Sequence, residues 1–248
     1  MAKKVEVRIK RQKDNQAEPY WEEFHVDYQP NMNVITLLQE IQRNPVTVQG
    51  EKTTPVAWDC SCLEEICGAC TMVINGQVQQ SCSALVDNLE QPIVLEPMRK
   101  FPIVRDLLVD RTRMFEALKK VKAWIPIDGT YDLGAGPKQS QTNQQEMYLY
   151  SRCMTCGCCV DACPQYTPDN SFVGPAALGQ VFLFNQNPTG KFNKEERLAA
   201  IMGDGGIQEC GNAQNCVRVC PKEIPLTTGI AKLNGATLSQ ALKNLLKK

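Results

Sequence analysis

The sequence has 248 residues, a length that suits one large domain or two of ordinary size. Its 27 Lys and Arg residues balance its 27 Asp and Glu residues, so the formal net charge of zero gives no overall electrostatic attraction to nucleic acid. Hydrophobic residues make up 43% of the chain and charged residues 22%, which excludes a disordered or collagen-like protein.

Thirteen cysteines are the unusual feature of this composition. An odd number of thiols cannot all pair as disulfides, and the residues after Met1 alternate between charged and apolar types, unlike the apolar segment of a secretory signal. We therefore expect reduced thiols in a cytosol-like compartment. No apolar run approaches the ~20 residues that a membrane helix needs, so we expect no spanning segment, although peripheral attachment stays open.

Strand patterns dominate the first hundred residues. Alternation of apolar and polar residues predicts strands over residues 5–10, 24–28, 71–74, 77–81 and 93–95. The first two strands are expected to pair as a hairpin, and Asn75-Gly76 predicts a type I′ turn between the third and the fourth. Asn33 is a candidate N-cap for an amphipathic helix that Pro45 ends. A small sheet with one helix is therefore predicted.

After Pro102 apolar residues recur at helical spacing, first from Leu107 to Val121, and no further alternating segment is evident. Further helices are predicted at about residues 176–184, 194–202 and 238–247. The residues between Pro126 and Glu146 predict an exposed connection from their Gly, Gln, Ser and Asn content. Within it, residues 134–136 lack the third glycine of a dinucleotide-binding fingerprint. We place a domain boundary near residue 105.

Four cysteines of the N-terminal part have the spacing of a plant-type 2Fe-2S site. They are Cys62-x4-Cys67-x2-Cys70 and, after eleven more residues, Cys82. The predicted hairpin brings the last thiol back to the first three, and Gly68 leaves room for backbone to approach inorganic sulfide. A structural zinc site is the alternative, but zinc ligands usually come as two close pairs rather than as three and one.

A second group of cysteines follows the spacing of bacterial ferredoxins. The run is Cys153-x2-Cys156-x2-Cys159-x3-Cys163-Pro164. Because the fourth cysteine of such a run binds the other cluster of a two-cluster unit, a partner run is expected downstream. That run is Cys210-x5-Cys216-x3-Cys220-Pro221, in which Ala213 stands where the middle thiol should fall.

Exchanging the last cysteine of each run assigns four thiols to one centre and three to another. The predicted 4Fe-4S ligands are Cys153, Cys156, Cys159 and Cys220, and the remaining three are Cys163, Cys210 and Cys216. Ala213 would leave one corner of the second centre without a ligand, so a 3Fe-4S cluster is the simplest stable outcome. Cys60 and Cys158 are expected to be spectators, although a role as substitute ligand stays open for either.

Other chemistry finds little support in the residues. His25 is the only histidine, which excludes a Rieske centre within this chain, and it is expected at the surface or edge of a strand. No paired acid and base suggests substrate chemistry, so we predict no catalytic residue. Three one-electron centres are what the cysteines indicate.

The sequence resembles a known family, the iron-sulfur subunits of succinate dehydrogenase and fumarate reductase. The resemblance is carried by the segments 59–70 and 104–107 and by the two Cys-Pro runs, and it covers essentially the whole chain in order. It implies an α+β fold. A plant-type ferredoxin-like (β-grasp) domain would occupy residues 1–105, and an all-helical bacterial ferredoxin-like domain would occupy residues 106–248.

The resemblance also implies the setting in which such a chain works. An FAD-containing flavoprotein subunit would hold the succinate site, and electrons would pass one at a time through 2Fe-2S, 4Fe-4S and 3Fe-4S clusters. A membrane anchor subunit of the cytochrome b type would present quinone near the last cluster. The chain would lie peripherally on the cytoplasmic face of the cell membrane, within a succinate:quinone oxidoreductase.

The quinone contacts of the family are only partly kept. Pro164 matches a quinone-proximal proline, whereas Pro168 and Gly211 stand where many members have a tryptophan and a histidine. This departure favours the menaquinone-linked branch. Two alternatives stay open: the equivalent subunit of another flavin-linked complex, such as a glycerol-3-phosphate or thiol-dependent fumarate reductase, and a free-standing ferredoxin-like carrier.

Overall fold

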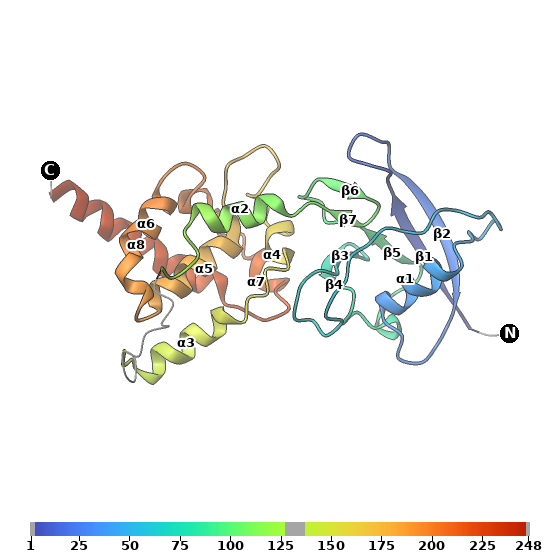
Figure 1. Ribbon diagram of the computed structural model, residues 1–248, viewed down its shortest axis with the longest axis horizontal. Coiled ribbons are helices and arrows are strands. Elements are labelled where there is room, and N and C mark those ends of the chain that lie inside the picture. The colour runs from blue at the N-terminus through green and yellow to red at the C-terminus, as the bar shows by residue number, and fades with distance from the viewer. Residues whose placement is uncertain (1–2, 127–136, 247–248) are drawn as a thin grey trace. The chain divides into compact units, whose positions relative to one another are not determined.

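The computed structural model describes residues 3–126 and 137–246, and Figure 1 labels their helices and strands. The chain divides into two compact units, which we describe one at a time. Unit 1 consists of Met1–Arg111 together with Met154–Asp161, and unit 2 of Thr112–Cys153 and Ala162–Lys248. A short segment of the second cysteine run thus belongs to unit 1. The two cluster-binding domains predicted with a boundary at residue 105 stay a prediction.

The described part of unit 1 is built on a mixed sheet with the order β2-β1-β5-β3-β4. The strands are β1 (Lys4–Arg11), β2 (Tyr20–Asp27), β3 (Thr71–Ile74), β4 (Gln77–Gln80) and β5 (Ile93–Glu96). β1 pairs antiparallel with β2 and parallel with β5, while β3 is antiparallel to both β4 and β5. All five predicted strands and the first hairpin are therefore confirmed.

One apolar face of this sheet packs on helix α1 (Val34–Arg43). The alternation in β1 buries Val5, Val7 and Ile9, and the 3.6-residue period of α1 buries Leu37 and Leu38 opposite them. Each such side chain contributes about 1.5–3 kcal/mol when it leaves water. The predicted N-cap is confirmed, since the Asn33 side chain accepts a hydrogen bond of 2.9 Å from the Thr36 N–H.

The hairpin of β3 and β4 brings together the two cysteines that flank it in the sequence. Asn75 and Gly76 have φ values of 48° and 81°, the left-handed conformations that a type I′ turn requires. The register pairs Thr71 with Gln80, so the residues just outside this hairpin, Cys70 and Cys82, lie at the same end of it. The hairpin that was predicted to bring Cys82 back towards the other thiols is therefore confirmed.

A two-stranded ribbon, β6 (Ile103–Arg105) and β7 (Leu108–Val109), was not predicted. The expected helical pattern from Leu107 is wrong at its start, because α2 begins only at Thr112 and ends at Lys120. Strands of two or three residues are too short to display a period of two. A short 3-10 turn, η1 (Val86–Asn88), and helix α4 (Cys158–Asp161) complete the elements of unit 1.

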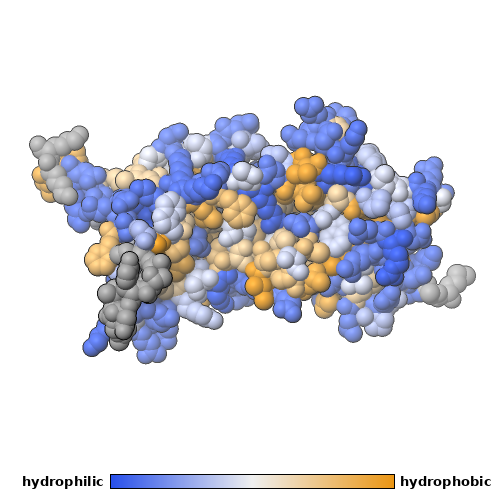
Figure 2. Space-filling view, in the orientation of Figure 1, coloured by the Kyte–Doolittle hydropathy of each residue, from blue (hydrophilic) through white to orange (hydrophobic). Residues whose placement is uncertain are grey.

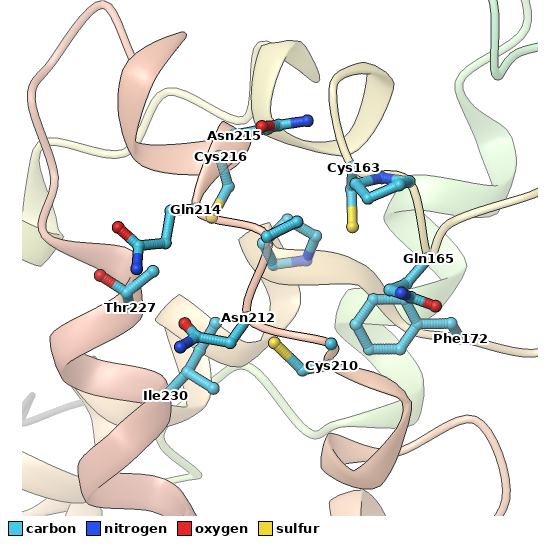
Figure 3. A pocket seen from close by; sticks show the side chains of 14 residues that line it. Cys163, Gln165, Phe172, Cys210, Asn212, Gln214, Asn215, Cys216, Thr227 and Ile230 are labelled. Atoms are coloured by element: carbon cyan, nitrogen blue, oxygen red, sulfur yellow. The ribbon is translucent and has the colours of Figure 1, made fainter.

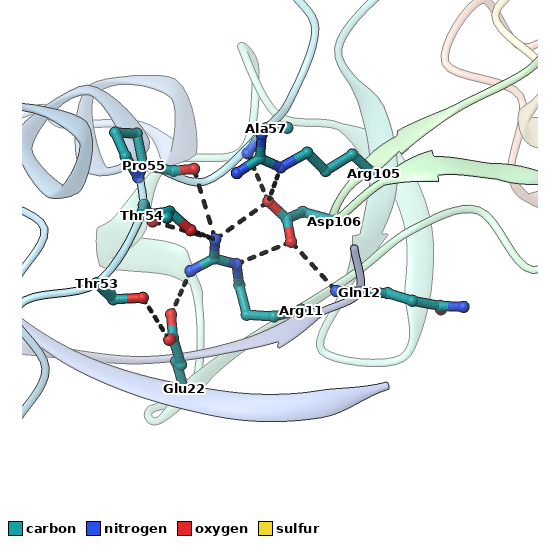
Figure 4. Close-up of polar contacts among 9 residues, drawn as sticks. All are labelled: Arg11, Gln12, Glu22, Thr53, Thr54, Pro55, Ala57, Arg105 and Asp106. Carbon is teal, nitrogen blue, oxygen red and sulfur yellow. Dashed lines mark hydrogen bonds and ion pairs between the residues drawn. The ribbon is translucent and has the colours of Figure 1, made fainter. Parts of the chain in front are cut away.

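The turn of the ribbon carries a buried ion pair that joins distant parts of unit 1 (Figure 4). Asp106 accepts from Arg11 at both carboxylate oxygens, with distances of 2.9 and 3.2 Å, and the two side chains are only 3% and 1% exposed. Arg11 also binds Glu22 and the carbonyl of Thr54. Burial lowers the pKa of Arg11, but its hydrogen bond to Asp106 and the charges of both carboxylates outweigh this effect and leave the pKa raised.

Unit 2 is helical in its described residues. Its elements are α2, α3 (Gln141–Ser151), α5 (Gly174–Gln186), η2 (Gly190–Asn193), α6 (Lys194–Met202), η3 (Ile207–Glu209), α7 (Asn215–Arg218) and α8 (Leu226–Leu246). The predicted helices at 176–184 and 194–202 are confirmed, and the one predicted at 238–247 is the end of the much longer α8. The described residues of unit 2 contain no strand.

Helix α3 corrects the predicted connection between Pro126 and Glu146. Residues 141–146 are exposed for the most part but helical, because Ser140 caps the helix by accepting from the Asn143 N–H at 3.2 Å. Because the sequence of this helix is mostly polar, it shows no apolar period from which the helix could have been predicted. The remainder of that prediction, including residues 127–136 and the glycines of the 134–136 segment, lies outside the described residues.

The core of unit 2 forms around α5, which packs against α3 and α8. Tyr150 of α3 donates its hydroxyl to the Pro225 carbonyl at 2.7 Å, and a Cβ at Gly229 would meet that hydroxyl at 2.7 Å. The absence of a side chain at Gly229 therefore lets α8 approach α3 closely. The described helices include none with the length and apolarity needed to traverse a lipid bilayer.

Candidate functional site

The loop before β3 wraps the sulfur of Cys62 in backbone N–H groups. Glu64, Ile66 and Cys67 donate to the Cys62 Sγ over 3.4, 3.3 and 3.2 Å. Leu63 adopts a left-handed φ of 62°, which helps to turn successive N–H groups inward. These hydrogen bonds lower the pKa of Cys62 to about 7, so the loop favours a thiolate, the form that binds iron.

The neighbouring thiols form two pairs. Cys67 Sγ accepts from the N–H groups of Cys62 and Ala69, each at 3.4 Å, so Cys62 and Cys67 face one another. Cys70 and Cys82 are both buried and hydrogen-bonded to each other, and burial raises the pKa of Cys70 to about 12. Two pairs of thiols fit a 2Fe-2S cluster, whose two irons each take two protein ligands.

Cys60 lies beside this group. It packs with Trp58 against Cys70 and Cys82. Burial is the main cause that raises the pKa of Cys60, with a contribution from Asp59. Cys60 belongs to neither of the two thiol pairs, and its spectator role stays a prediction.

Gly68 makes room for a chain segment. A Cβ at this position would lie 2.6 Å from the Cα and 2.7 Å from the Cβ of Cys156, which belongs to the same unit. From the sequence, the missing side chain is expected to let backbone approach inorganic sulfide; in the described atoms the close neighbour of Gly68 is the backbone of the second cysteine run. Gly68 also has a φ of 73°, so both the space and the conformation require glycine.

Two adjacent thiols of that segment differ in character. A hydrogen bond from Cys158 lowers the pKa of Cys156 to about 7, whereas the same hydrogen bond and burial raise the pKa of Cys158. Cys158 is fully buried and its Sγ accepts from Gln80 Nε2 at 3.5 Å. Cys158 thus serves as a donor to a candidate ligand. This role was not predicted, because the ligand spacing of bacterial ferredoxins does not include the position of Cys158.

The four predicted 4Fe-4S ligands are distributed over both units. Cys156 and Cys159 are buried residues of unit 1, and Cys153 and Cys220 are half-buried residues of unit 2. Within unit 2 the Cys220 Sγ accepts from the Ile224 N–H at 3.5 Å. The thiol chemistry suits an iron-sulfur cluster, and the assignment of this set stays a prediction.

Three thiols of unit 2 line one cavity, and their sulfur atoms point into it (Figure 3). They are Cys163, Cys210 and Cys216, and the wall between the last two includes Ala213. Burial and the neighbouring thiols raise the pKa of Cys216 to about 11. Three sulfur donors around one space, with a methyl group at a fourth position, fit a cluster that lacks one iron.

The chain around Ala213 is strongly wound. Asn212 and Gln214, on either side of it, both adopt left-handed φ values, of 53° and 62°. Gln214 precedes α7, which carries Cys216. This winding brings Cys210 and Cys216 to one cavity although five residues separate them in the sequence.

A glutamine takes the space beside Gly211. A Cβ there would meet the Gln165 Nε2 at 2.5 Å, so the amide occupies the position where a larger side chain at residue 211 would begin. Gln165 and Pro164 also line the three-thiol cavity, while Pro168 is exposed. Gln165 was not singled out from the sequence, because only the tertiary contact gives it a role.

Among residues 3–126 and 137–246, no group of three or more His, Cys, Asp or Glu side chains could hold one metal ion. Cluster ligands can lie farther apart because each pair or single thiolate binds a different iron. His25 is exposed on β2, as expected, and contributes to none of the thiol groups.

Comparison with known proteins matches two family models. Residues 6–116 match the 2Fe-2S iron-sulfur cluster binding domain, and residues 149–224 match the 4Fe-4S dicluster domain. These ranges contain the thiols of the N-terminal loop and of both cysteine runs, respectively. The cofactor types expected from the spacing are thereby confirmed for the 2Fe-2S and 4Fe-4S classes.

Whole-chain relatives are also found. The chain is 60% identical over 242 residues to the succinate dehydrogenase iron-sulfur subunit of Bacillus subtilis, covering 98% of this chain and 96% of that protein. It is 30% identical over 227 residues to the fumarate reductase iron-sulfur subunit of Wolinella succinogenes, covering 90% and 92%. In fold it resembles a chain of the Mycobacterium smegmatis Sdh1 complex in the apo form, with a TM-score of 0.78, 19% identity and coverage of 97% and 98%.

Proposed function

The chain belongs to the family of succinate dehydrogenase and fumarate reductase iron-sulfur subunits, and we propose that it is the electron-transfer subunit of a succinate:quinone oxidoreductase. The observation that carries the proposal within this chain is the cavity lined by three thiols and Ala213. A carrier with only 2Fe-2S and complete 4Fe-4S sites would have a fourth cysteine there.

We assign the ligands by the pairing and spacing of the thiols. The 2Fe-2S ligands are Cys62, Cys67, Cys70 and Cys82. The 4Fe-4S ligands are Cys153, Cys156, Cys159 and Cys220. The 3Fe-4S ligands are Cys163, Cys210 and Cys216. The two pairs in the N-terminal loop and the shared cavity in unit 2 support the first and third sets.

When bound, each such cluster exchanges one electron at a time, which allows a series of them to join a two-electron flavin to a distant acceptor. The chain contributes the thiolates and the groups that tune them. N–H groups around Cys62 and Cys67 stabilise negative charge on sulfur, and more hydrogen bonds to sulfur raise the potential of a centre.

Membership in the family implies a flavoprotein subunit and a membrane anchor as partners. For the flavoprotein we propose the surface of the thiol loop, where Leu63 and Ile66 are 47% and 60% exposed. Apolar side chains this exposed beside a redox centre suit a partner surface, because contact with a partner would remove them from water. Figure 2 shows that apolar residues reach the surface in patches among hydrophilic ones. We propose that the subunit lies on the cytoplasmic face of the membrane, held by an anchor of the cytochrome b type.

The acceptor that we propose is menaquinone. Support comes from Gly211 and Pro168, which replace the histidine and tryptophan of the other branch, and from the Gln165 amide that fills the space beside Gly211. Pro164, which lines the three-thiol cavity, is the quinone-proximal residue. A purified complex should therefore react faster with a naphthoquinone than with a benzoquinone.

The decisive test is the cluster inventory of the purified complex. Iron and sulfide analysis with EPR should give one 2Fe-2S, one 4Fe-4S and one 3Fe-4S centre. Cys67→Ser should abolish the 2Fe-2S signal alone, and Cys60→Ser, a matched thiol outside the assigned set, should leave it in place. A different inventory in the wild-type complex would overturn the proposal.

The alternatives separate in two further measurements. Activity with glycerol-3-phosphate or with thiol donors, but not with succinate or fumarate, would favour another flavin-linked complex. Recovery of the chain as a cluster-loaded monomer free of flavoprotein and of membranes would favour a free-standing carrier.

A further inference from the structure

Arg111 connects the thiol loop of unit 1 to the segment that carries Cys156. Its Nη1 donates to the Gly68 carbonyl at 2.7 Å and its Nη2 to the Ala69 carbonyl at 2.6 Å. Nη1 also reaches the Cys156 carbonyl at 3.4 Å. One guanidinium therefore binds the backbone of two segments of unit 1, each of which carries proposed ligands of a different cluster.

The two backbones are in direct contact at this place. A Cβ at Gly68 would lie 2.6 Å from the Cys156 Cα, so no side chain separates the segments. A second link runs through Gln80, whose Nε2 donates to Thr71 Oγ1 at 2.7 Å and to Cys158 Sγ at 3.5 Å. Because electron-transfer rates fall exponentially with the gap between centres, contact without intervening side chains favours rapid exchange.

Arg111 also places a positive charge beside the two segments that carry the proposed ligands. Burial lowers the pKa of Arg111, while the charges of Asp59 and of the nearby thiols oppose this lowering, and an arginine stays protonated at physiological pH. A cluster becomes more negative on reduction. A partly buried positive charge beside it therefore favours the reduced form, and solvent screens that charge less than one on the surface.

We propose that Arg111 is a positioning residue for electron exchange between the 2Fe-2S and 4Fe-4S centres, and that its charge raises the potentials of both. One electron is exchanged, one centre is oxidised as the other is reduced, and no atom is transferred. The inference rests on the proposed function, since both clusters must be present.

The test is an EPR-monitored redox titration of the purified complex carrying Arg111→Gln. At a fixed potential the ratio of reduced to oxidised form should fall about tenfold for both centres, which is a drop of about 59 mV in each midpoint. The magnetic interaction between the two reduced centres should weaken. Arg43→Gln removes the same charge from an exposed site on α1, where the guanidinium pairs with Glu40, and should change neither quantity.

Arg111→Lys separates charge from geometry. A lysine keeps the positive charge but lacks the planar fork that binds several carbonyls, so both midpoints should stay near the wild-type values while the magnetic interaction weakens. If Arg111→Gln fails to assemble clusters, an unchanged magnetic interaction in Arg111→Lys overturns the proposal. Loss of both clusters from both variants also overturns it, because Arg111 would then serve folding alone.

The outcomes also distinguish this inference from the proposed function. Wild-type complex without 2Fe-2S and 4Fe-4S signals would overturn the proposed function itself. Wild-type complex with both signals, together with an Arg111→Gln variant that keeps both clusters and titrates like wild type, would overturn only the role of Arg111.

Discussion

Replacing Asp106 by Asn should destabilise unit 1 and with it the thiol loop. The carboxylate accepts from Arg11 Nε and the Gln12 N–H at one oxygen, and from Arg11 Nη2 and the Ala57 N–H at the other. Asn has a single acceptor oxygen. Whichever way the amide is turned, its NH2 group faces two of these donors, which lose their acceptor at residue 106; one of the two is always a backbone N–H, of Gln12 or of Ala57.

The magnitude follows from this geometry. Each buried donor left unsatisfied costs about 1–3 kcal/mol, and removing one partner of a buried ion pair costs about 3–5 kcal/mol. We therefore expect a loss of about 3–5 kcal/mol, which for a chain of this size lowers the melting temperature by roughly 6–20 °C. The Ala57 bond to Asp106 and the 3.0 Å bond from the Leu107 N–H to the Ala57 carbonyl hold the segment that leads into the thiol loop. Loss of the 2Fe-2S visible circular dichroism on heating should therefore shift with the unfolding transition.

Arg105→Gln provides the matched control. Arg105 Nε lies 3.7 Å from the same carboxylate, but its side chain is 47% exposed, so its loss should cost less than about 1 kcal/mol. If Asp106→Asn shifts the transition no more than Arg105→Gln does, the buried ion pair does not stabilise unit 1 as proposed.

Three further predictions concern the helical part and the second cysteine run. Ala213→Cys should convert the three-iron centre to a four-iron one, and an oxidised-state three-iron EPR signal that persists would contradict the ligand assignment. Cys158→Ala should keep the 4Fe-4S signal, because Cys158 acts as a hydrogen-bond donor to Cys156. Loss of that signal in the variant would indicate that Cys158 is a ligand. Burial raises the pKa of Tyr150 from 10.0 to about 12, so its hydroxyl stabilises the fold below pH 10 and this contribution is lost as the pH rises towards 12. Relative to Tyr150→Phe, the wild type should lose on the order of 2–3 kcal/mol over that range in chemical unfolding, and parallel curves for the two proteins would contradict this.

Local patterns predicted the elements that are long or strongly periodic. β1 and α1 display periods of two and 3.6 because one face of each is buried, and the Asn75-Gly76 turn follows from the φ values that these residues tolerate. The ribbon of β6 and β7 is too short for a period, and the polar helix α3 depends on its Ser140 cap rather than on an apolar face. A segment with neither periodicity nor a strong turn signal cannot be assigned to a helix or a strand from its local sequence.

The cysteines by themselves determined the chemistry of this protein, because affinity for iron belongs to the thiolate and the spacing of ligands within a loop is a local property. Only the tertiary structure decided which groups tune those thiolates. Arg11 meets Asp106 across 95 residues, Arg111 meets Gly68 across 43, and Gln80 meets Cys158 across 78. No local pattern encodes such pairs, since each arises from the packing of segments that approach one another only in the folded chain.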